Sequence, residues 1–324
     1  MIGFFGHEPA NFICLNGCSN MPTSNSGRPP DFSGNTIAVL GGDRREQEIA
    51  RLAAASGAKV RAYGFPWPDR GIAGVELMSD AESTLKGVRF VLFPIPASHK
   101  DGAVYALAAK EKIYPDEKLL GLMAPRGHII VGLPDEFLIK SAKACSVTLH
   151  EYNSDLELMY GRGPTIVEGI LEALIKNTEI TINRAAIAVL GQGTIGALLT
   201  RTLHLLGARV TVFARNPIQR AAAQAMGVEA VPLDTLGARA PELDMIVSCA
   251  SSLIVTEPIL KRLPQHAVVI DIAATPGTVD FDAAKALGIT AVWARGLGNR
   301  APVTAGASQW AGIARRLEKI IAES

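Results

Sequence analysis

The segment Ala186-Ile187-Ala188-Val189-Leu190-Gly191-Gln192-Gly193-Thr194-Ile195-Gly196 decides how the rest of the chain is interpreted. Its apolar start is typical of a buried strand, and the Gly-x-Gly-x-x-Gly that follows opens a helical pattern. A second apolar run follows at 209–213. Gly191 permits the tight turn, Gly193 lets the backbone approach a pyrophosphate, and Gly196 lets helix and strand pack closely. This order of strand, turn, helix and strand predicts a dinucleotide-binding Rossmann unit.

The end of the second strand indicates which dinucleotide binds. A free ribose 2′-hydroxyl is usually held by an Asp or Glu about 20 residues past the glycines. Here Phe213 is followed by Ala214-Arg215-Asn216-Pro217, which contains no carboxylate. A guanidinium suits a 2′-phosphate because it donates two parallel charge-assisted hydrogen bonds. We therefore expect NADP rather than NAD, with Arg215 on the 2′-phosphate and Asn216 and Arg220 beside it.

Bulk properties narrow the class of protein. The chain has 324 residues, 48% of them hydrophobic, and a mean hydropathy of +0.22, which suggests two domains with ample cores. Its 32 basic and 31 acidic residues are well mixed and give a net charge of +1, so neither nucleic acid nor a membrane surface is an expected partner. No apolar run reaches the ~18 residues of a membrane span. We expect a soluble, cytoplasmic protein.

Cysteine usage indicates neither a disulfide framework nor a metal site. The four cysteines, at positions 14, 18, 145 and 249, are too few and too scattered for a set of disulfides. Cys14 and Cys18 alone make a poor zinc site because no second pair of ligands accompanies them. We expect no bound metal.

The chain divides into a tail and two α/β halves. Residues 1–35 are rich in Asn, Ser, Gly and Pro, which predicts a disordered tail without a secretory signal. Residues 36–163 form a flavodoxin- or Rossmann-like substrate domain, and residues 164–304 form the NADP-binding Rossmann domain. A helix from about 165 to 177 joins them, and the amphipathic C-terminal helix at 305–324 is expected to pack on the first domain.

The expected fold class is therefore α/β, with two doubly wound, mostly parallel Rossmann-like domains. Ligands of such sheets lie at the carboxyl ends of the strands, so the substrate is expected in an interdomain cleft. The first domain is expected to take the substrate, because its turn Gly41-Gly42-Asp43-Arg44-Arg45 lacks the third glycine of the fingerprint.

Six segments from residue 36 onward also carry a family resemblance. They are Ile37-Ala38-Val39-x-Gly41-Gly42-Asp43-x-Arg45, Pro164-Thr165…Glu168-Gly169, Val189-Leu190-Gly191-x-Gly193, Asp271-x-Ala273…Pro276-Gly277…Asp280-Phe281, Gly296-Leu297, and Ala301-Pro302-x-Thr304-Ala305-Gly306. In this order they resemble the family of the dipicolinate synthase A subunit. The resemblance implies a two-domain NADP dehydrogenase that oxidises a dihydrodipicolinate-type cyclic imine dicarboxylate to dipicolinate. It also implies a branch of the lysine and diaminopimelate pathway, a link to sporulation, a flavoprotein-like B subunit as partner, and a homo-oligomer.

Three loops depart from the family pattern. The family has Ser-Arg-Pro-Gly-Gly where this chain has Ala274-Thr275-Pro276-Gly277-Thr278, and Lys where it has Val303. The linker 161–169 is one residue longer. Because two cations are missing, a related cyclic imine or amino acid stays open as the substrate. Two alternatives also stay open: a dehydrogenase of a different opine-like or shikimate-like acid, and a non-catalytic NADP-binding subunit of a complex.

Hydride transfer needs the nicotinamide held against the substrate and a group that exchanges a proton. Small residues in the loops after two later strands should flank the nicotinamide, so the expected cofactor residues are Gly191, Gln192, Gly193, Thr194, Ile195, Gly196, Arg215, Asn216, Arg220, Cys249, Ala250 and Ala273.

For the proton we expect His99, which lies in a loop at the carboxyl end of a strand. Glu168 and Asp271 are further catalytic candidates, and His128 competes with them. Glu168 fits a capping box with Thr165 equally well, and Asp271 fits a buried strand-end residue equally well.

A dicarboxylate substrate requires cationic or polar clamps. The expected substrate-binding residues are Arg162, Thr165 and Arg300, and the turn Gly42-Asp43-Arg44 is a further candidate.

Overall fold

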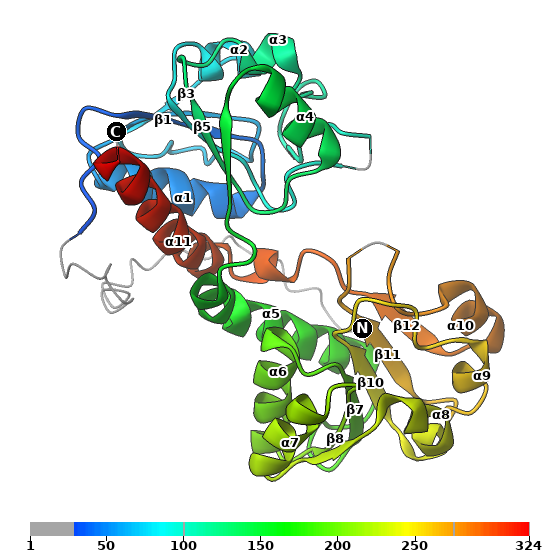
Figure 1. The fold of residues 1–324 in the computed structure, drawn as a ribbon. Coiled ribbons are helices and arrows are strands. Elements are labelled where there is room, and N and C mark those ends of the chain that lie inside the picture. Colours follow the sequence, from blue (N-terminus) through cyan, green and yellow to red (C-terminus); the bar gives the residue numbers. More distant parts are fainter. Residues whose placement is uncertain (1–28, 100, 275, 324) are drawn as a thin grey trace, which may run out of the picture.

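The computed structural model describes residues 29–99, 101–274 and 276–323. Figure 1 shows two lobes, each built on a parallel β-sheet with helices on both faces, joined by α5 and by the segment that leads into α11. The expected fold class, two doubly wound Rossmann-like domains, is confirmed.

The first sheet has the order β3-β2-β1-β4-β5-β6, and all its neighbours are parallel. This is the dinucleotide-binding order rather than the flavodoxin order, so the flavodoxin alternative for this half was wrong. The strands are β1 (Thr36–Leu40), β2 (Lys59–Tyr63), β3 (Val75–Leu77), β4 (Phe90–Leu92), β5 (His128–Val131) and β6 (Thr148–Glu151).

The second sheet has the order β12-β11-β10-β7-β8-β9, also parallel throughout. Counted from β7, it repeats the order of the first sheet, so the two domains share one topology. The strands are β7 (Ala186–Leu190), β8 (Arg209–Phe213), β9 (Glu229–Val231), β10 (Met245–Ser248), β11 (Val268–Asp271) and β12 (Thr290–Trp293).

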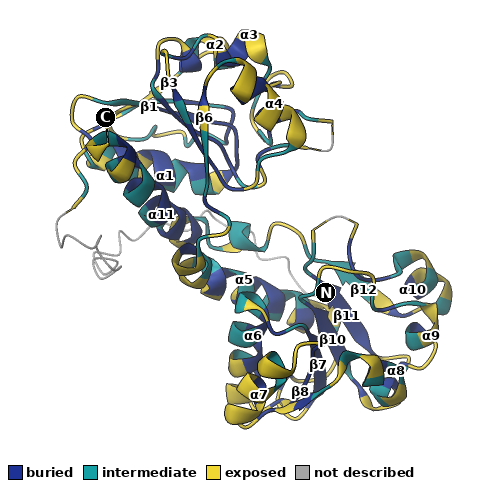
Figure 2. Ribbon diagram, viewed as in Figure 1, coloured by how far each residue is buried: buried dark blue, intermediate teal, exposed yellow. Residues whose placement is uncertain are grey.

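Helices cover both faces of each sheet, and their exposed sides point to solvent (Figure 2). The first domain has α1 (Arg44–Ala55), α2 (Ala81–Leu85), α3 (Glu117–Leu120) and α4 (Glu136–Ala144). The second has α6 (Thr194–Leu205), α7 (Pro217–Ala225), α8 (Leu236–Arg239), α9 (Glu257–Leu260) and α10 (Phe281–Leu287), with the 3₁₀ turns η1 (Leu233–Thr235), η2 (Ala240–Glu242) and η3 (Leu297–Arg300).

Helix α5 (Leu156–Asn177) begins nine residues before the helix expected from about 165, so that start was wrong. Asp155 caps its first turn by accepting from Leu158 N at 3.1 Å. The helix continues through Pro164. Because proline usually ends or kinks a helix, the sequence led us to expect the start after it. The expected boundary between residues 163 and 164 therefore lies inside one continuous helix. Leu158 packs in the core of the first domain, whereas Ile170 packs in that of the second.

Helix α11 (Pro302–Ala322) returns the chain to the first domain and lies along α1 and α5 (Figure 1). Trp310 and Leu317 belong to the buried cluster on that face of the first sheet. Phe32 belongs to it as well: it is fully buried and meets the Trp310 ring edge-on, with the ring centroids 5.8 Å apart. Residues 29–35 are therefore part of the packed domain, and a disordered tail reaching residue 35 was wrong. The rest of that predicted tail, and Cys14 and Cys18, lie outside the described residues.

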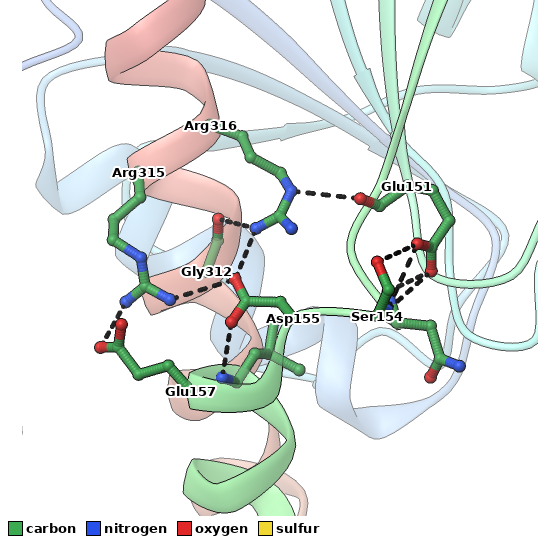
Figure 3. Close-up of polar contacts among 9 residues, drawn as sticks. Glu151, Ser154, Asp155, Glu157, Gly312, Arg315 and Arg316 are labelled. Carbon is green, nitrogen blue, oxygen red and sulfur yellow. Dashed lines mark hydrogen bonds and ion pairs between the residues drawn. The ribbon is translucent and has the colours of Figure 1, made fainter.

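Two arginines of α11 tie it to the start of α5, as Figure 3 shows. Arg316 Nη1 donates to Asp155 at 2.8 Å, and Arg315 donates to Asp155 at 3.3 Å and to Glu157 at 2.8 Å. Arg316 also donates to the carbonyls of Glu151 and Gly312. The two helices that connect the domains are therefore fastened to each other where α5 leaves the first domain.

Candidate functional site

The glycine turn after β7 is built to receive an anion. Gly191 has a φ of +89°, which places it in the left-handed region. A Cβ on Gly196 would lie 2.1 Å from the Gly191 carbonyl oxygen, so only glycine fits there. A Cβ on Gly193 would meet no atom within 4 Å. Gly193 is the N-cap of the 12-residue helix α6 and offers no side-chain acceptor, so the first N–H groups of the helix are left to a ligand or water.

Gln192, between the first two glycines, is buried with its amide only half satisfied. Its Oε1 accepts from the Thr200 hydroxyl at 3.0 Å. Its Nε2 has no partner within the part of the chain that the structure describes. A buried N–H donor without an acceptor at a phosphate-binding turn fits a site that receives an acceptor from a ligand or water.

Two adjoining hollows lie at the carboxyl ends of β7, β8 and β10. The one over the glycine turn has a volume of about 330 Å³, and the neighbouring one has about 570 Å³. Arg215 and Leu233 line both. This places Arg215 at the junction of two spaces in which the parts of a dinucleotide can lie, and a nicotinamide dinucleotide cofactor fits these residues. The expected cofactor residues that line the smaller hollow are Gly191, Gln192, Gly193, Arg215, Asn216, Cys249 and Ala250.

The three polar residues expected on the 2′-phosphate have different local partners. Arg215 is exposed, and its Nη2 donates to Ser252 Oγ at 3.2 Å. Asn216 Oδ1 caps α7 by accepting from Ile218 N at 2.8 Å. Arg220 Nη1 donates to the carbonyls of Ala214 and Arg215, at 2.8 and 2.7 Å.

Asp271 is fully buried at the end of β11. Its two carboxylate oxygens accept from Ala273 N at 2.9 Å and from Thr278 N at 2.6 Å. Trp293 Nε1 holds the same loop by donating to the Ala273 carbonyl at 2.8 Å. Of the two interpretations of Asp271, this geometry matches the buried strand-end residue: the carboxylate braces the loop that contains Ala273.

Cys249 lies beside this loop, at the end of β10. Burial, followed by the nearby charge of Asp271, raises the pKa of its thiol to about 12. The thiol is therefore protonated at neutral pH and serves as an uncharged wall of the hollow, not as a nucleophile.

The histidines occupy opposite edges of the first sheet. His99 is exposed in the loop after β4, and its ring meets Tyr105 edge-on with centroids 5.5 Å apart. His128 lies at the amino end of β5, where its Nδ1 is 3.0 Å from His150 Nε2. Burial, reinforced by His150, lowers the pKa of His128. Of His99 and His128, it is His99 that lies at the carboxyl ends of the strands, where ligands of such sheets bind.

Glu168 and Arg300 form an ion pair between α5 and η3, and both side chains remain substantially exposed. The capping-box explanation for Glu168 was wrong, because α5 begins at Leu156 and position 168 lies in its interior. Thr165 is buried, and its hydroxyl donates to the Arg162 carbonyl at 2.7 Å.

Arg162 is half-buried near the N-terminal end of α5. Its Nη2 donates to Asn153 Oδ1 at 2.8 Å, and its Nε is buried with no partner among the residues described. Burial lowers the pKa of this guanidinium, and Arg45 lowers it further. It remains charged at neutral pH, since an arginine pKa lies far above 7.

In the first-domain turn, where Gly42-Asp43-Arg44 is a candidate carboxylate clamp, three backbone donors have partners within the protein and the Arg44 side chain is exposed. Gly41 N and Gly42 N donate to the carbonyls of Tyr63 and Tyr105 at 2.8 and 2.6 Å. Asp43 N donates to Glu46 Oε2 at 2.7 Å. These three backbone donors are therefore already engaged within the protein.

A buried ionic cluster that the sequence did not reveal surrounds this turn. Arg45 donates from Nε and Nη2 to Asp43, at 2.9 and 2.8 Å, and from Nη2 to the Ile95 carbonyl at 2.7 Å. Complete burial raises the pKa of Glu46 to about 7 although Arg45 opposes this shift. The only signal in the sequence was the Asp-x-x-Glu spacing of a capping box, from Asp43 to Glu46.

Within the described residues, no group of three or more His, Cys, Asp or Glu side chains could hold a metal ion. No helix in that part of the chain is both long and apolar enough to span a membrane.

Comparisons with known proteins agree with this architecture. Residues 36–153 match the model of the N-terminal domain of the dipicolinate synthase A subunit, and residues 173–291 match that of shikimate / quinate 5-dehydrogenase. The dipicolinate synthase A subunit of Bacillus subtilis (strain 168) is 30% identical over 294 residues, which cover 90% of this chain and 97% of that protein. The chain belongs to the family of the dipicolinate synthase A subunit.

Solved structures give the same result. The crystal structure of the dipicolinate synthase A subunit from Bacillus halodurans is 30% identical, with a TM-score of 0.81 over 88% of this chain and 98% of that one. The A chain of the Bacillus subtilis enzyme is 28% identical, with a TM-score of 0.81 over 91% and 99%. Sinorhizobium meliloti transhydrogenase is 13% identical, with a TM-score of 0.65 over 88% and 94%, and so shares the fold alone. Together with the shikimate-type domain, these matches support a dehydrogenase of the NAD(P) type.

Proposed function

We propose that this chain is an NADP-dependent oxidoreductase that oxidises a dihydrodipicolinate-type cyclic imine dicarboxylate to dipicolinate. The observation that supports NADP best is the position of Arg215, an exposed guanidinium at the junction of two hollows beside an anion-binding glycine turn. The family supports the substrate, because its members are named as the A subunit of dipicolinate synthase.

A nicotinamide cofactor bound at this site would supply a hydride acceptor for the substrate. In this proposal the N–H groups at the start of α6 bind the pyrophosphate, and Arg215 binds the 2′-phosphate. The loop Cys249–Ser251 and the loop braced by Asp271 flank the nicotinamide with small residues. Removal of a hydride and one proton from the dihydro ring leaves the aromatic ring of dipicolinate.

The proton and the two carboxylates need residues from both domains. His99 takes the proton, since it is exposed at the carboxyl edge of the first sheet. Arg300 and Arg162 are the proposed carboxylate clamps. Arg300 already pairs with Glu168, so a substrate carboxylate exchanges one exposed anionic partner for another. Arg162 offers a charged group whose Nε lacks a partner among the described residues.

The assembly is also proposed from the family. The name of an A subunit implies a second subunit. We propose that this B subunit is flavoprotein-like and that a homo-oligomer of this chain binds it. A cytoplasmic location, a branch from the lysine and diaminopimelate pathway and a role in sporulation belong to the same proposal.

One observation favours a second candidate. The match of residues 173–291 to shikimate / quinate 5-dehydrogenase is compatible with an alicyclic hydroxy acid as substrate. The two candidates share the cofactor site and differ in the groups that face the substrate.

The test is a spectrophotometric assay of NADPH formation with enzymatically generated hydroxytetrahydrodipicolinate, run with and without the B subunit. Formation of dipicolinate supports the proposal, and turnover of shikimate instead supports the second candidate. A protein that binds NADPH and oxidises neither acid with the B subunit present refutes both and fits a non-catalytic role.

The cofactor choice is tested separately by titrating NADPH and NADH into the protein and its Arg215→Ala variant. Loss of a charge-assisted phosphate contact should weaken NADPH binding by at least about tenfold and leave NADH binding almost unchanged. Equal affinities in the unmutated protein would refute the assignment. They would point instead to ribose recognition by Asp234, which lines the larger hollow.

A further inference from the structure

The loop that contains Arg215 is held by a second arginine. Arg220 lies on α7, one turn beyond the loop, and is half-buried. Its Nη1 donates to two successive carbonyls, those of Ala214 at 2.8 Å and Arg215 at 2.7 Å. Both bonds fix the backbone directly at the residue whose side chain lies between the two hollows.

These contacts also satisfy the two carbonyl oxygens of the loop, each of which accepts a hydrogen bond from the Arg220 guanidinium. Ala214 is itself buried, so its carbonyl would lose its side-chain donor in a place with little access to water.

The remaining contacts leave Arg215 as the residue best placed to meet a ligand. Asn216 is engaged in capping α7. Arg215 makes one hydrogen bond, to Ser252, at the wall between the hollows. The loop is therefore held by the Arg220 guanidinium, which binds its carbonyls, and by Asn216, which caps α7. The Arg215 guanidinium is left facing the two hollows.

We propose that Arg220 is a positioning residue for cofactor specificity. It does not bind the 2′-phosphate itself, but holds the backbone that aims Arg215 at it. This inference rests on the proposed NADP dependence. It differs from the sequence-based expectation, in which Arg220 reaches the same phosphate directly.

The two mechanisms predict different results in a double-mutant cycle. If Arg220 acts through Arg215, its removal has no further effect once Arg215 is gone. If both arginines bind the phosphate, the two losses multiply. The readout is affinity, measured by calorimetric titration of the full chain with NADPH, NADH, adenosine 2′,5′-bisphosphate and AMP.

Each variant has its own expected result. Arg220→Met should weaken NADPH and adenosine 2′,5′-bisphosphate by about five- to tenfold, no more than removal of the Arg215 contact itself. It should change NADH and AMP binding by less than about twofold. In the Arg215→Ala background the same change should alter NADPH affinity by less than about twofold. Arg220→Gln, whose amide still donates one hydrogen bond, should fall between the unmutated protein and Arg220→Met.

Arg209 provides a matched control. It lies at the opposite end of β8 and also donates to a backbone carbonyl, that of Arg184 at 3.0 Å. Arg209→Met should leave all four affinities unchanged. Melting temperatures of every variant separate a local effect from unfolding, and Arg220→Gln carries the test if Arg220→Met does not fold.

Several outcomes overturn the inference without touching the proposed function. Multiplying losses in the double variant show direct phosphate binding by Arg220. Equal losses of NADPH and NADH show general damage to the cofactor domain, and no loss at all shows that Arg215 needs no support. Equal NADPH and NADH affinity in the unmutated protein overturns instead the NADP assignment on which the inference rests.

Discussion

The contact between the two connecting helices gives a quantitative prediction about stability. Asp155 caps α5 and accepts from Arg315 and Arg316, and its side chain is only 15% exposed (Figure 3). Asp155→Asn keeps a side-chain oxygen for the cap, since Asn and Asp are equally good N-caps. The substitution removes the negative charge with which both Arg315 and Arg316 form ion pairs. Arg315 keeps Glu157, and Arg316 keeps two backbone carbonyls.

The expected loss of stability follows from what Asp155→Asn keeps, the helix cap, and what it removes, the charge. Losing charge-assisted hydrogen bonds at a mostly buried carboxylate should reduce the free energy of unfolding by about 1.5–3 kcal/mol. At roughly 2.1 cal/mol/K per residue, a chain of 324 residues shifts by about 1.5 °C for each kcal/mol, so the melting temperature should fall by about 2–5 °C. Asp155→Ala also removes the cap and should cost a further ~1 kcal/mol. Scanning calorimetry of the full chain measures both.

The control is Glu157→Gln, which removes the exposed member of the same network. Glu157 is 66% exposed, and exposed ion pairs contribute about 0–1 kcal/mol. Glu157→Gln should therefore shift the melting temperature far less than Asp155→Asn. The reasoning fails if Asp155→Asn has the same melting temperature as the unmutated protein, or if Glu157→Gln lowers the melting temperature as much as Asp155→Asn does.

The pH dependence supplies an independent check on the charge of Asp155. Burial alone would raise the pKa of this carboxyl, but the hydrogen bonds from Arg316 and from Leu158 N–H outweigh it, and the net shift is downward. A pKa lowered by folding gives stability that is present above the unfolded value of about 4 and lost as the pH falls through the folded value. The difference between the unmutated protein and Asp155→Asn should thus be constant near neutral pH and shrink below about pH 4.

Three further outcomes test other parts of the structure. Phe32→Ala should cost about 3–5 kcal/mol in chemical denaturation, because the ring is fully buried against Trp310; a change below about 1 kcal/mol would show that residues 29–35 do not pack on the domain. Asp271→Asn leaves one of two buried backbone N–H groups facing an amide N–H. In calorimetric titration this should weaken the binding of NADPH but not that of adenosine 2′,5′-bisphosphate. Equal weakening of both ligands would place the effect outside the nicotinamide loop. Arg300→Ala should raise the KM for an acidic substrate by about 10–100-fold with NADPH affinity within about twofold, and an unchanged KM for every acid turned over would remove Arg300 from the substrate site.

Much of the second domain was predictable because its signals are local. The glycine fingerprint places β7, the turn and α6 in one stretch, and the second apolar run at 209–213 is β8. The family, identified from six ordered segments, is confirmed over 90% of the chain. The three-residue edge strands β3 and β9 carry no comparable signal, since so few residues show no clear alternation.

The errors arose where tertiary contacts outweigh local preference. Pro164 favours a helix boundary, but α5 continues because its two ends pack in the cores of two domains. Residues 29–35 resemble a tail because their composition favours turns. Tertiary contacts outweigh this preference: Phe32 packs on Trp310, and Phe32 N donates to the Ser56 carbonyl. The roles of Asp271 and Arg220 depend on which backbone groups face them, and spacing in the sequence does not contain that information.

The two domains show why a shared topology does not give a shared ligand. Both turns begin alike: Gly41 N donates to the end of β2, and Gly191 N donates to the end of β8. Two residues later each chain segment reaches the N-cap of its helix, Asp43 or Gly193. The third position of that helix is Gly196 in the second domain, where a side chain would strike the turn.

In the first domain the same position is Glu46. Its carboxylate folds back over Gly42, so closely that a Cβ there would lie 2.2 Å from the carboxyl carbon, and it accepts from the N–H of the N-cap residue. The N-terminus of this helix is therefore already occupied by a buried carboxyl group of the protein itself. A pyrophosphate would have to displace this group from a site without solvent. The first domain thus keeps the dinucleotide-binding strand order while one side chain closes its phosphate site, which supports a single cofactor site, in the second domain, with the first domain available to the substrate.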